Sequence, residues 1–484
     1  MKAIKISIST ILIVAFATYT SYTQSSITLD EVLQQVKENS FAIKSAKTNV
    51  AIAEEGNKFY RSLLKPSVTL RANLPNFSKT SSPIIQPDGT IAFQSISQAN
   101  SSVSLFATQA ISQTGGTLFL NTDFQRFDDL SSEYKTYNGI PIRLGISQPL
   151  FGYNPWKYEK VIQPLLLQEA EKNYNTAVES ALSEATSLYF DILIVNQNLE
   201  IAITNERVNE DLLRITEERL SLGKVSKDEK LQLEIELNNA KLAVSQASNE
   251  LVQAKARLNT FLGKSESSDI EYIEPERLTE ATLDYNQLLQ SYQKNRPEIT
   301  EYQRALTESK QDIAETKANF GFQASINASI GLARGSETPS EIYSDPFDEQ
   351  QFNLSLQVPI LDWGKRKSAV AQTKLRQDNL TASYEQQVLT LENNINQLGL
   401  AFERLQRDIS LLKEIMDKAD ERFTISNERY VLGNISITNL TLAQREKDQA
   451  KRNYINALKS YWVSYYQLRL FTGYDIITKA DIKY

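Results

Sequence analysis

Apolar residues recur along the chain in two distinct periods, and the longer one predicts helices. From residue 233 onward they step by four and three, a heptad pattern typical of helices packed side by side with a left-handed supercoil. The first stripe comprises Leu233, Leu237, Ala240, Val244, Ala247, Leu251, Ala254, Leu258 and Phe261. A second comprises Ala450, Tyr454, Ala457, Tyr461, Ser464, Leu468 and Phe471. These stripes alone are equally compatible with an ordinary intracellular coiled coil.

The shorter period is two, and it predicts strands with one apolar and one polar face. Val68, Leu70, Ala72 and Leu74 alternate with polar residues, and so do segments 142–146, 322–332 and 352–358. In a membrane barrel the apolar face meets lipid and the polar face a wet lumen, and segments of about 10 residues fit a tilted span. Two strands in each half give four per chain, too few to enclose a lumen. We therefore expect several chains to contribute to one barrel.

The chain contains an internal repeat, because residues 142–263 align with residues 352–473 at a constant offset of 210. The first copy, 25–265, is expected to hold helices at 29–64, strands and a loop at 66–150, and a long helical hairpin at 156–262. The second, 266–484, is expected to hold helices at 283–319, strands at 321–360 and a helical hairpin at 365–472. At 1.5 Å per residue the long helices would extend on the order of 100 Å. That length predicts a tube or a coiled coil.

Residues 75–140 hold an additional alternating pair around the Thr114-Gly115-Gly116 turn, which predicts a hairpin. The second copy lacks this segment. We therefore expect an external loop here and four barrel strands per chain, with additional barrel strands as the alternative.

Composition narrows the function classes. The chain has no cysteine and no histidine, which excludes thiol and imidazole catalysis and Cys/His metal sites. The formal net charge of −7 argues against nucleic acid as a partner. We expect no cofactor and no enzymatic activity. Residues 1–24 combine a charged start with a short apolar stretch, as in a cleaved signal peptide. The alternative function is a periplasmic coiled-coil scaffold with a soluble β-sheet.

Aromatic residues follow the strands that lead into the long helices. Tyr153 and Trp156 follow one strand, and Trp363 follows its repeat equivalent. Tyrosine and tryptophan favour the membrane–water interface. The alternative is that they cap a soluble strand–helix junction.

The order and duplication of the motifs resemble the TolC family of outer-membrane efflux proteins. The matching motifs are Q-P-L-F at 148–151, V-P-I-L at 358–361, the R-x-x-L-G turns, and the terminal F-L-G and F-T-G. The resemblance implies an α+β membrane protein: a homotrimer with a twelve-stranded barrel in the outer membrane of a Gram-negative bacterium. A coiled-coil helical barrel would extend into the periplasm. It also implies a passive duct for efflux or type I secretion, surrounded by outer-membrane lipid. A periplasmic adaptor protein and an inner-membrane pump of the RND or ABC type would open it.

The resemblance places adaptor contacts at the two turns that join the long helices. The matching residues are Leu222, Gly223, Ser226, Leu432, Gly433 and Ser436. The alternative is that each glycine only closes a helical hairpin.

The resemblance also implies a periplasmic gate, held in the family by a tyrosine, an arginine and an acidic residue. Tyr430 and Glu229 match the tyrosine and the acid, whereas Ile435 stands at the arginine position. We expect a Tyr430–Glu229 hydrogen bond, with two unconnected residues as the alternative. Asn439 and Leu442 stand where family members have acidic rings, which predicts a gate that closes by narrowness and dewetting.

Overall fold

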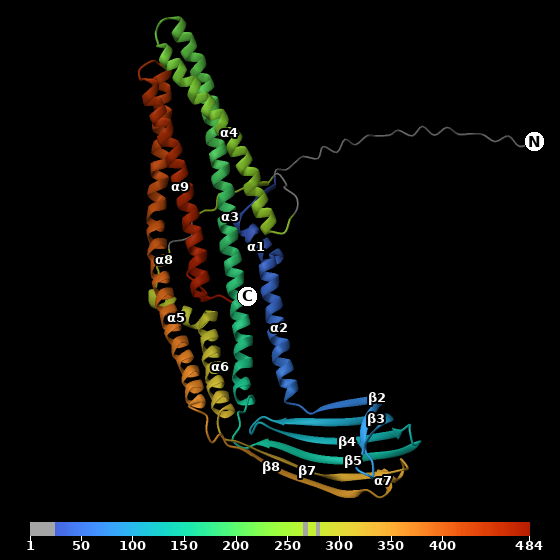
Figure 1. The fold of residues 1–484 in the computed structure, drawn as a ribbon. Coiled ribbons are helices and arrows are strands. Elements are labelled where there is room, and N and C mark those ends of the chain that lie inside the picture. Colours follow the sequence, from blue (N-terminus) through green and yellow to red (C-terminus); the bar gives the residue numbers. More distant parts are fainter. Residues whose placement is uncertain (1–24, 265–269, 277–280) are drawn as a thin grey trace, which may run out of the picture. The chain divides into compact units, whose positions relative to one another are not determined.

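The structure is a computed structural model that describes residues 25–264, 270–276 and 281–484 (Figure 1). The expected signal peptide, 1–24, lies outside the described residues. The chain forms two compact units. One comprises the described parts of 1–40, 184–278 and 408–460, and the other those of 41–183, 279–407 and 461–484. Each unit therefore draws on both copies of the sequence repeat.

Eight helices of 11 to 67 residues account for most of the described chain. They are α1 (Leu29–Asn39), α2 (Phe41–Leu63), α3 (Trp156–Ser221), α4 (Lys227–Phe261), α5 (Tyr285–Asn295), α6 (Pro297–Asn319), α8 (Lys365–Val431) and α9 (Ile437–Thr472). A single turn, α7 (Glu341–Ser344), lies between two strands. Among the described residues, no helix combines the length and the apolar character that crossing a membrane requires.

Local sequence explains where these helices begin and end. Thr28 and Glu31 form a capping box at the start of α1, in which each side chain accepts from the other residue's backbone N–H. Ser226 caps α4 by accepting from the N–H of Glu229 at 3.2 Å. Gly223 and Gly433 follow α3 and α8 with φ of +71° and +82°, which glycine adopts without a steric penalty.

One antiparallel sheet has the strand order β2-β3-β4-β5-β7-β8. Its strands are β2 (Ser67–Ile85), β3 (Ile91–Ile111), β4 (Gly116–Asp129), β5 (Tyr134–Pro149), β7 (Gln323–Ser336) and β8 (Phe347–Gln357), all of which lie in one unit. Figure 1 shows them side by side as a curved sheet. Two small ladders complete the strands: β1 (Ser25–Ile27) with β6 (Ile270–Tyr272), and β9 (Tyr474–Asp475) with β10 (Ala480–Asp481).

The sheet has six strands, where the sequence predicted four. The hairpin of β3 and β4, within the segment 75–140 that was expected to form an external loop, lies in the sheet between β2 and β5. β3 pairs with β2 along nearly its whole length, and β4 pairs with β5. These ladders satisfy the backbone groups of the hairpin, which a surface loop would leave to water.

The buried Tyr189 anchors the small ladder of β1 and β6 in the other unit. Its hydroxyl donates to the carbonyl oxygens of Ile27 at 3.0 Å and Ile273 at 2.6 Å. Burial raises the pKa of this hydroxyl, so it stays protonated and remains a donor. One side chain thus joins α3 to segments separated from it by 162 and 84 residues.

Candidate functional site

The large sheet carries most of its apolar residues on one face. The strand registers place one row across all six strands, in the order Val68, Ala107, Leu120, Leu144, Ile330 and Gln350. Val68 is 65% exposed and Ile330 63% exposed, although both are apolar and belong to ordered strands. A continuous exposed apolar face of this kind requires a covering medium or partner.

The opposite face of the same sheet is mainly polar. The adjacent row runs in the order Thr69, Phe106, Asn121, Arg143, Gly331 and Glu349. Arg143 and Glu349 form an ion pair across this row. Side chains of neighbouring strands also bond directly, as Ser147 with Asn327 at 2.7 Å and Gln125 with Asn100 at 2.9 Å. The alternation predicted from the sequence therefore separates an apolar face of the sheet from a polar, hydrogen-bonded face.

Tyr430, at the end of α8, is the predicted gate residue that the structure defines best. It is 2% exposed and packs in an apolar cluster with Leu212, Leu233, Phe423, Ile437 and Leu440. Its hydroxyl is hydrogen-bonded to that of Thr216, 2.9 Å away. The structure thus gives this hydroxyl a neutral partner, Thr216, where the sequence suggested Glu229. The backbone of Glu229 is instead part of the cap of α4.

Arg219 is a tip residue that the sequence reasoning did not assign to the gate. Its guanidinium donates to the carbonyl oxygen of Tyr430 at 3.0 Å and to that of Val431, and lies 5.6 Å from the ring centroid of Tyr430. These carbonyls end α8, where a cation is favourable, and the carbonyl of Tyr430 also accepts from the N–H of Gly433 at 2.8 Å. The available signal was the repeated arginine four residues before each turn glycine, Arg219 and Arg429.

The remaining predicted tip residues divide into exposed and half-buried positions. Leu222 is 68% exposed and Leu432 is 74% exposed, beside the turn glycines. Ser226 and Ser436 are exposed where α4 and α9 begin. Ile435 is half-buried against the Tyr430 cluster. Asn439 and Leu442 are both exposed and lie three residues apart, hence on one side of α9.

The three predicted interface aromatics occupy different environments in one unit. Trp363 is 90% exposed, with a φ of +51°, in the turn before α8. Trp156 begins α3 and lies 6.3 Å from the ring of Tyr60. Tyr153 lies against Tyr158, with 6.0 Å between ring centroids, and is hydrogen-bonded to Gln311. The side chain of Trp363 is thus exposed to the surrounding medium, whereas Trp156 and Tyr153 also pack against residues of the helices.

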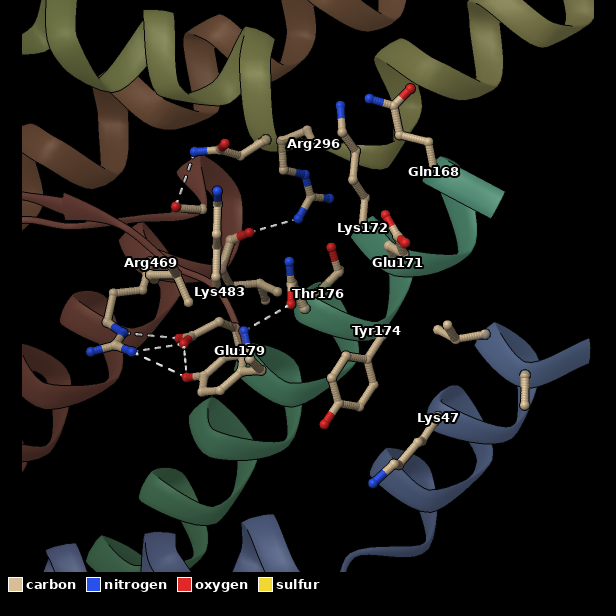
Figure 2. A pocket seen from close by; sticks show the side chains of 18 of the residues that line it. Lys47, Gln168, Glu171, Lys172, Tyr174, Thr176, Glu179, Arg296, Arg469 and Lys483 are labelled. Carbon is tan, nitrogen blue, oxygen red and sulfur yellow. Dashed lines mark hydrogen bonds and ion pairs between the residues drawn. The ribbon is translucent and has the colours of Figure 1, made fainter. Parts of the chain in front are cut away.

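A cavity of about 770 Å³ lies in the same unit, between α2, α3 and the segment after α9 (Figure 2). Charges of both signs line it, including Lys47, Lys172, Glu171 and Arg296. Burial lowers the pKa of Lys172, whose ammonium group donates to the carbonyl of Lys294 at 2.7 Å. Within the described ranges, no group of three or more Asp, Glu, His or Cys side chains could hold a metal ion.

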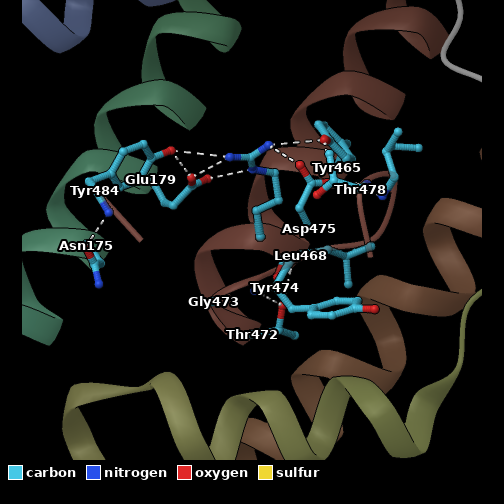
Figure 3. A network of polar contacts seen from close by, with 12 residues as sticks. Asn175, Glu179, Tyr465, Leu468, Thr472, Gly473, Tyr474, Asp475, Thr478 and Tyr484 are labelled. Atoms are coloured by element: carbon cyan, nitrogen blue, oxygen red, sulfur yellow. Dashed lines mark hydrogen bonds and ion pairs between the residues drawn. The ribbon is translucent and has the colours of Figure 1, made fainter. Parts of the chain in front are cut away.

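A network of buried charges, shown in Figure 3, includes Glu179 and Arg469, which also line this cavity. Arg469 of α9 donates to both carboxylate oxygens of Glu179 on α3, at 3.0 and 2.7 Å, and to Asp475 at 2.8 Å. Tyr465 and Tyr484 share the network through their hydroxyls. Burial alone would lower the pKa of Arg469, but its bonds to Glu179 outweigh burial and raise it. The network thus fastens α9 and the following segment to α3 with a fixed positive charge.

The two-faced sheet and the paired helical hairpins together define a class: a channel subunit of an outer membrane. A model of the outer membrane efflux protein family matches residues 32–264 and 288–474. The chain belongs to this family. It is thus an efflux protein of the outer membrane that extends into the periplasm, and a conduit without enzymatic activity.

Solved channels share the fold at low sequence identity. The CmeC outer membrane channel of Campylobacter jejuni superposes with a TM-score of 0.66 at 17% identity, covering 98% of this chain and 94% of that one. The outer-membrane channel OprN gives 0.66 at 19% identity, covering 92% and 89%.

Relatives in sequence are distant. Nodulation protein T of Rhizobium leguminosarum bv. trifolii is 22% identical over 321 residues, which are 65% of this chain and 68% of the relative. The solvent efflux pump outer membrane protein SrpC of Pseudomonas putida is 25% identical over 162 residues, 34% of each chain. The chain thus aligns with only about a third of the length of this second relative.

Proposed function

We propose that three copies of this chain form a closed outer-membrane barrel, continued by a periplasmic helical duct for efflux or type I secretion. The observation that carries this proposal is the two-faced sheet. β2 and β8 are its outermost strands, and within the described residues the outer edge of each has no partner strand. A membrane admits no open sheet edge, so β8 of one copy would pair with β2 of the next until the ring closes.

The exposed apolar face argues against the periplasmic scaffold. A soluble sheet would cover Val68, Leu70 and Phe352 with a core, yet all three are more than half exposed. Lipid covers such a face without any additional protein. Trp363, Tyr153 and Trp156 would lie near one membrane interface, where aromatic residues are enriched.

A periplasmic adaptor protein would contact the two turns that join the long helices, at Leu222, Gly223, Ser226, Leu432, Gly433 and Ser436. An inner-membrane pump of the RND or ABC type would supply the energy. The two exposed leucines support this contact, since each gives an apolar anchor beside a glycine turn. The Tyr430, Arg219 and Thr216 contacts would hold the gate closed, with the Asn439 and Leu442 side chains facing the passage.

The duct is tested by recording from the purified protein in planar lipid bilayers and by its oligomeric state in detergent. We expect a trimer on native gels, recovery in the outer-membrane fraction, and discrete conductance steps. A water-soluble monomer without conductance would overturn the proposal.

The proposed gate residues are tested separately, by measuring how strongly multivalent cations block the channel current. With amide and aliphatic rings at Asn439 and Leu442, divalent and trivalent cations added on the periplasmic side should block the current only weakly. The double variant Asn439→Asp with Leu442→Asp should create strong block, because it adds six carboxylates per trimer. Asn434→Asp, in the exposed turn nearby, is the matched control and should leave block weak. Micromolar block of the unmodified channel would contradict the placement of the gate.

A further inference from the structure

The hairpin of β3 and β4, residues 91–129, distinguishes the two copies of the repeat. In the second copy β7 is followed directly by α7 and β8. In the first copy the corresponding strands, β2 and β5, do not pair with each other, because the hairpin lies between them. Its position is therefore a property of this chain that its own repeat does not share.

The hairpin is integral to the sheet. Its two strands pair without interruption from Gln98 with Asp129 to Ile111 with Gly116. β3 has 21 residues and β4 has 14, more than the roughly 9–11 that a tilted membrane span needs. Both strands are therefore long enough to cross the bilayer.

The hairpin also continues both faces of the six-stranded sheet. Leu105 is paired with Leu70 of β2, and Leu120 with Leu144 of β5, so its apolar residues share the exposed apolar face. On the polar face Ser104 of β3 is hydrogen-bonded to Asp123 of β4. An external loop would need neither the shared apolar face nor these registers.

The polar face of the hairpin has one additional feature, a pair of aromatic residues. Phe106 and Phe119 lie in the polar rows of β3 and β4. A Cβ on Gly145 would come within 2.2 Å of the Phe119 ring, so that ring lies directly over the backbone of β5. The hairpin thus brings bulky apolar groups to a face that is otherwise mainly polar.

We propose that the hairpin 91–129 is part of the barrel wall, so that the trimeric barrel has eighteen strands. This inference rests on the proposed trimer. Barrel diameter grows roughly in proportion to strand number. With strands about 4.7 Å apart and a tilt of about 40°, eighteen strands give a backbone diameter of about 35 Å and twelve give about 23 Å. The exit through the outer membrane accordingly admits bulkier cargo, and Phe106 and Phe119 line it.

Spin labelling of the full-length trimer in lipid nanodiscs tests this directly, because the chain has no native cysteine. Single labels at Leu105→Cys, Ser102→Cys and Leu144→Cys are compared for collision with oxygen, which enriches in lipid, and with a water-soluble nickel chelate. Leu144 on β5 is the control for a wall strand. We expect Leu105 to match Leu144 in its lipid exposure, and Ser102, on the polar face, to be accessible to nickel.

The outcomes separate the two proposals. If Leu105 is as accessible to nickel as Ser102 while Leu144 contacts lipid, the hairpin is an external loop, and the duct itself stands. If Leu144 is also in water, the membrane barrel fails, and the hairpin proposal fails with it. Electron cryomicroscopy of the unmodified trimer gives a second measurement independent of any variant. Eighteen strands in the reconstructed barrel would support the proposal, and twelve would overturn it.

Discussion

Replacing Arg469 by methionine should destabilise the fastening between α3 and α9. The substitution keeps much of the side-chain volume but removes the cation that serves Glu179 and Asp475. Both carboxylates are buried, at 2% and 8% exposure, so neither can recover its lost bonds from water. Breaking a buried ion pair by removing one partner typically costs about 3–5 kcal/mol, because the other charge stays buried.

Without Arg469 the Glu179 carboxylate keeps the hydroxyl of Tyr484, and the Asp475 carboxylate keeps the hydroxyl of Tyr465 and the backbone N–H of Ile477. None of these partners carries the positive charge that is lost. We therefore expect the free energy of unfolding to fall by about 3–5 kcal/mol at pH 7.

The measurement is urea unfolding of the detergent-solubilised protein at pH 7, followed by helical circular dichroism. Arg469→Met combined with Glu179→Gln should recover part of the loss at pH 7, because the charge at Glu179 is gone. Arg214→Met is the matched control on α3. Its partner Asp211 is an exposed neighbour at 3.4 Å, and no measurable change is expected. An unfolding free energy unchanged in Arg469→Met, or no rescue by the second substitution, would refute this reasoning.

Three further predictions concern other contacts. Thr216→Val leaves the buried hydroxyl of Tyr430 without its partner and should cost about 1–3 kcal/mol in urea unfolding, whereas adding Tyr430→Phe should restore most of it; equal losses would contradict the bond. Gly145→Val should lower the yield of trimer in the outer membrane, because its side chain overlaps the ring of Phe119, and Phe119→Ala should restore it. Tyr189→Phe should speed hydrogen exchange at β1 and β6 by removing the donor to two carbonyls, and unchanged exchange would argue against that anchor.

The spacing of apolar residues and the residue types at the helix ends made the helices and the faces of the strands predictable. The long helices end near Gly223 and Gly433 because glycine there adopts a left-handed conformation, a signal visible in the sequence. The alternation around Leu70 and Leu144 likewise fixed which residues share a face. These features depend on neighbours within a few residues along the chain.

Strand partners and side-chain partners were not predictable in the same way. Alternation in the hairpin 91–129 indicates strands, but it does not say which strands they pair with, and comparison with the shorter second copy favoured a loop. Tyr430 and Thr216 are 214 residues apart, and their contact depends on how two helical hairpins pack. The sequence-based search for a charged partner therefore selected Glu229, whereas packing placed a neutral hydroxyl beside Tyr430.

Arg219 binds the end of α8 through main-chain carbonyl oxygens. Because these acceptors belong to the backbone, they affect which substitutions this turn can tolerate. Any residue at 430 or 431 supplies the same two carbonyl groups, so substitutions there leave the acceptors in place. The arginine itself has no such substitute, since lysine lacks the planar fork that reaches two oxygens at once. We therefore expect natural variants to tolerate exchange of Val431 far more readily than loss of the guanidinium group that binds its backbone.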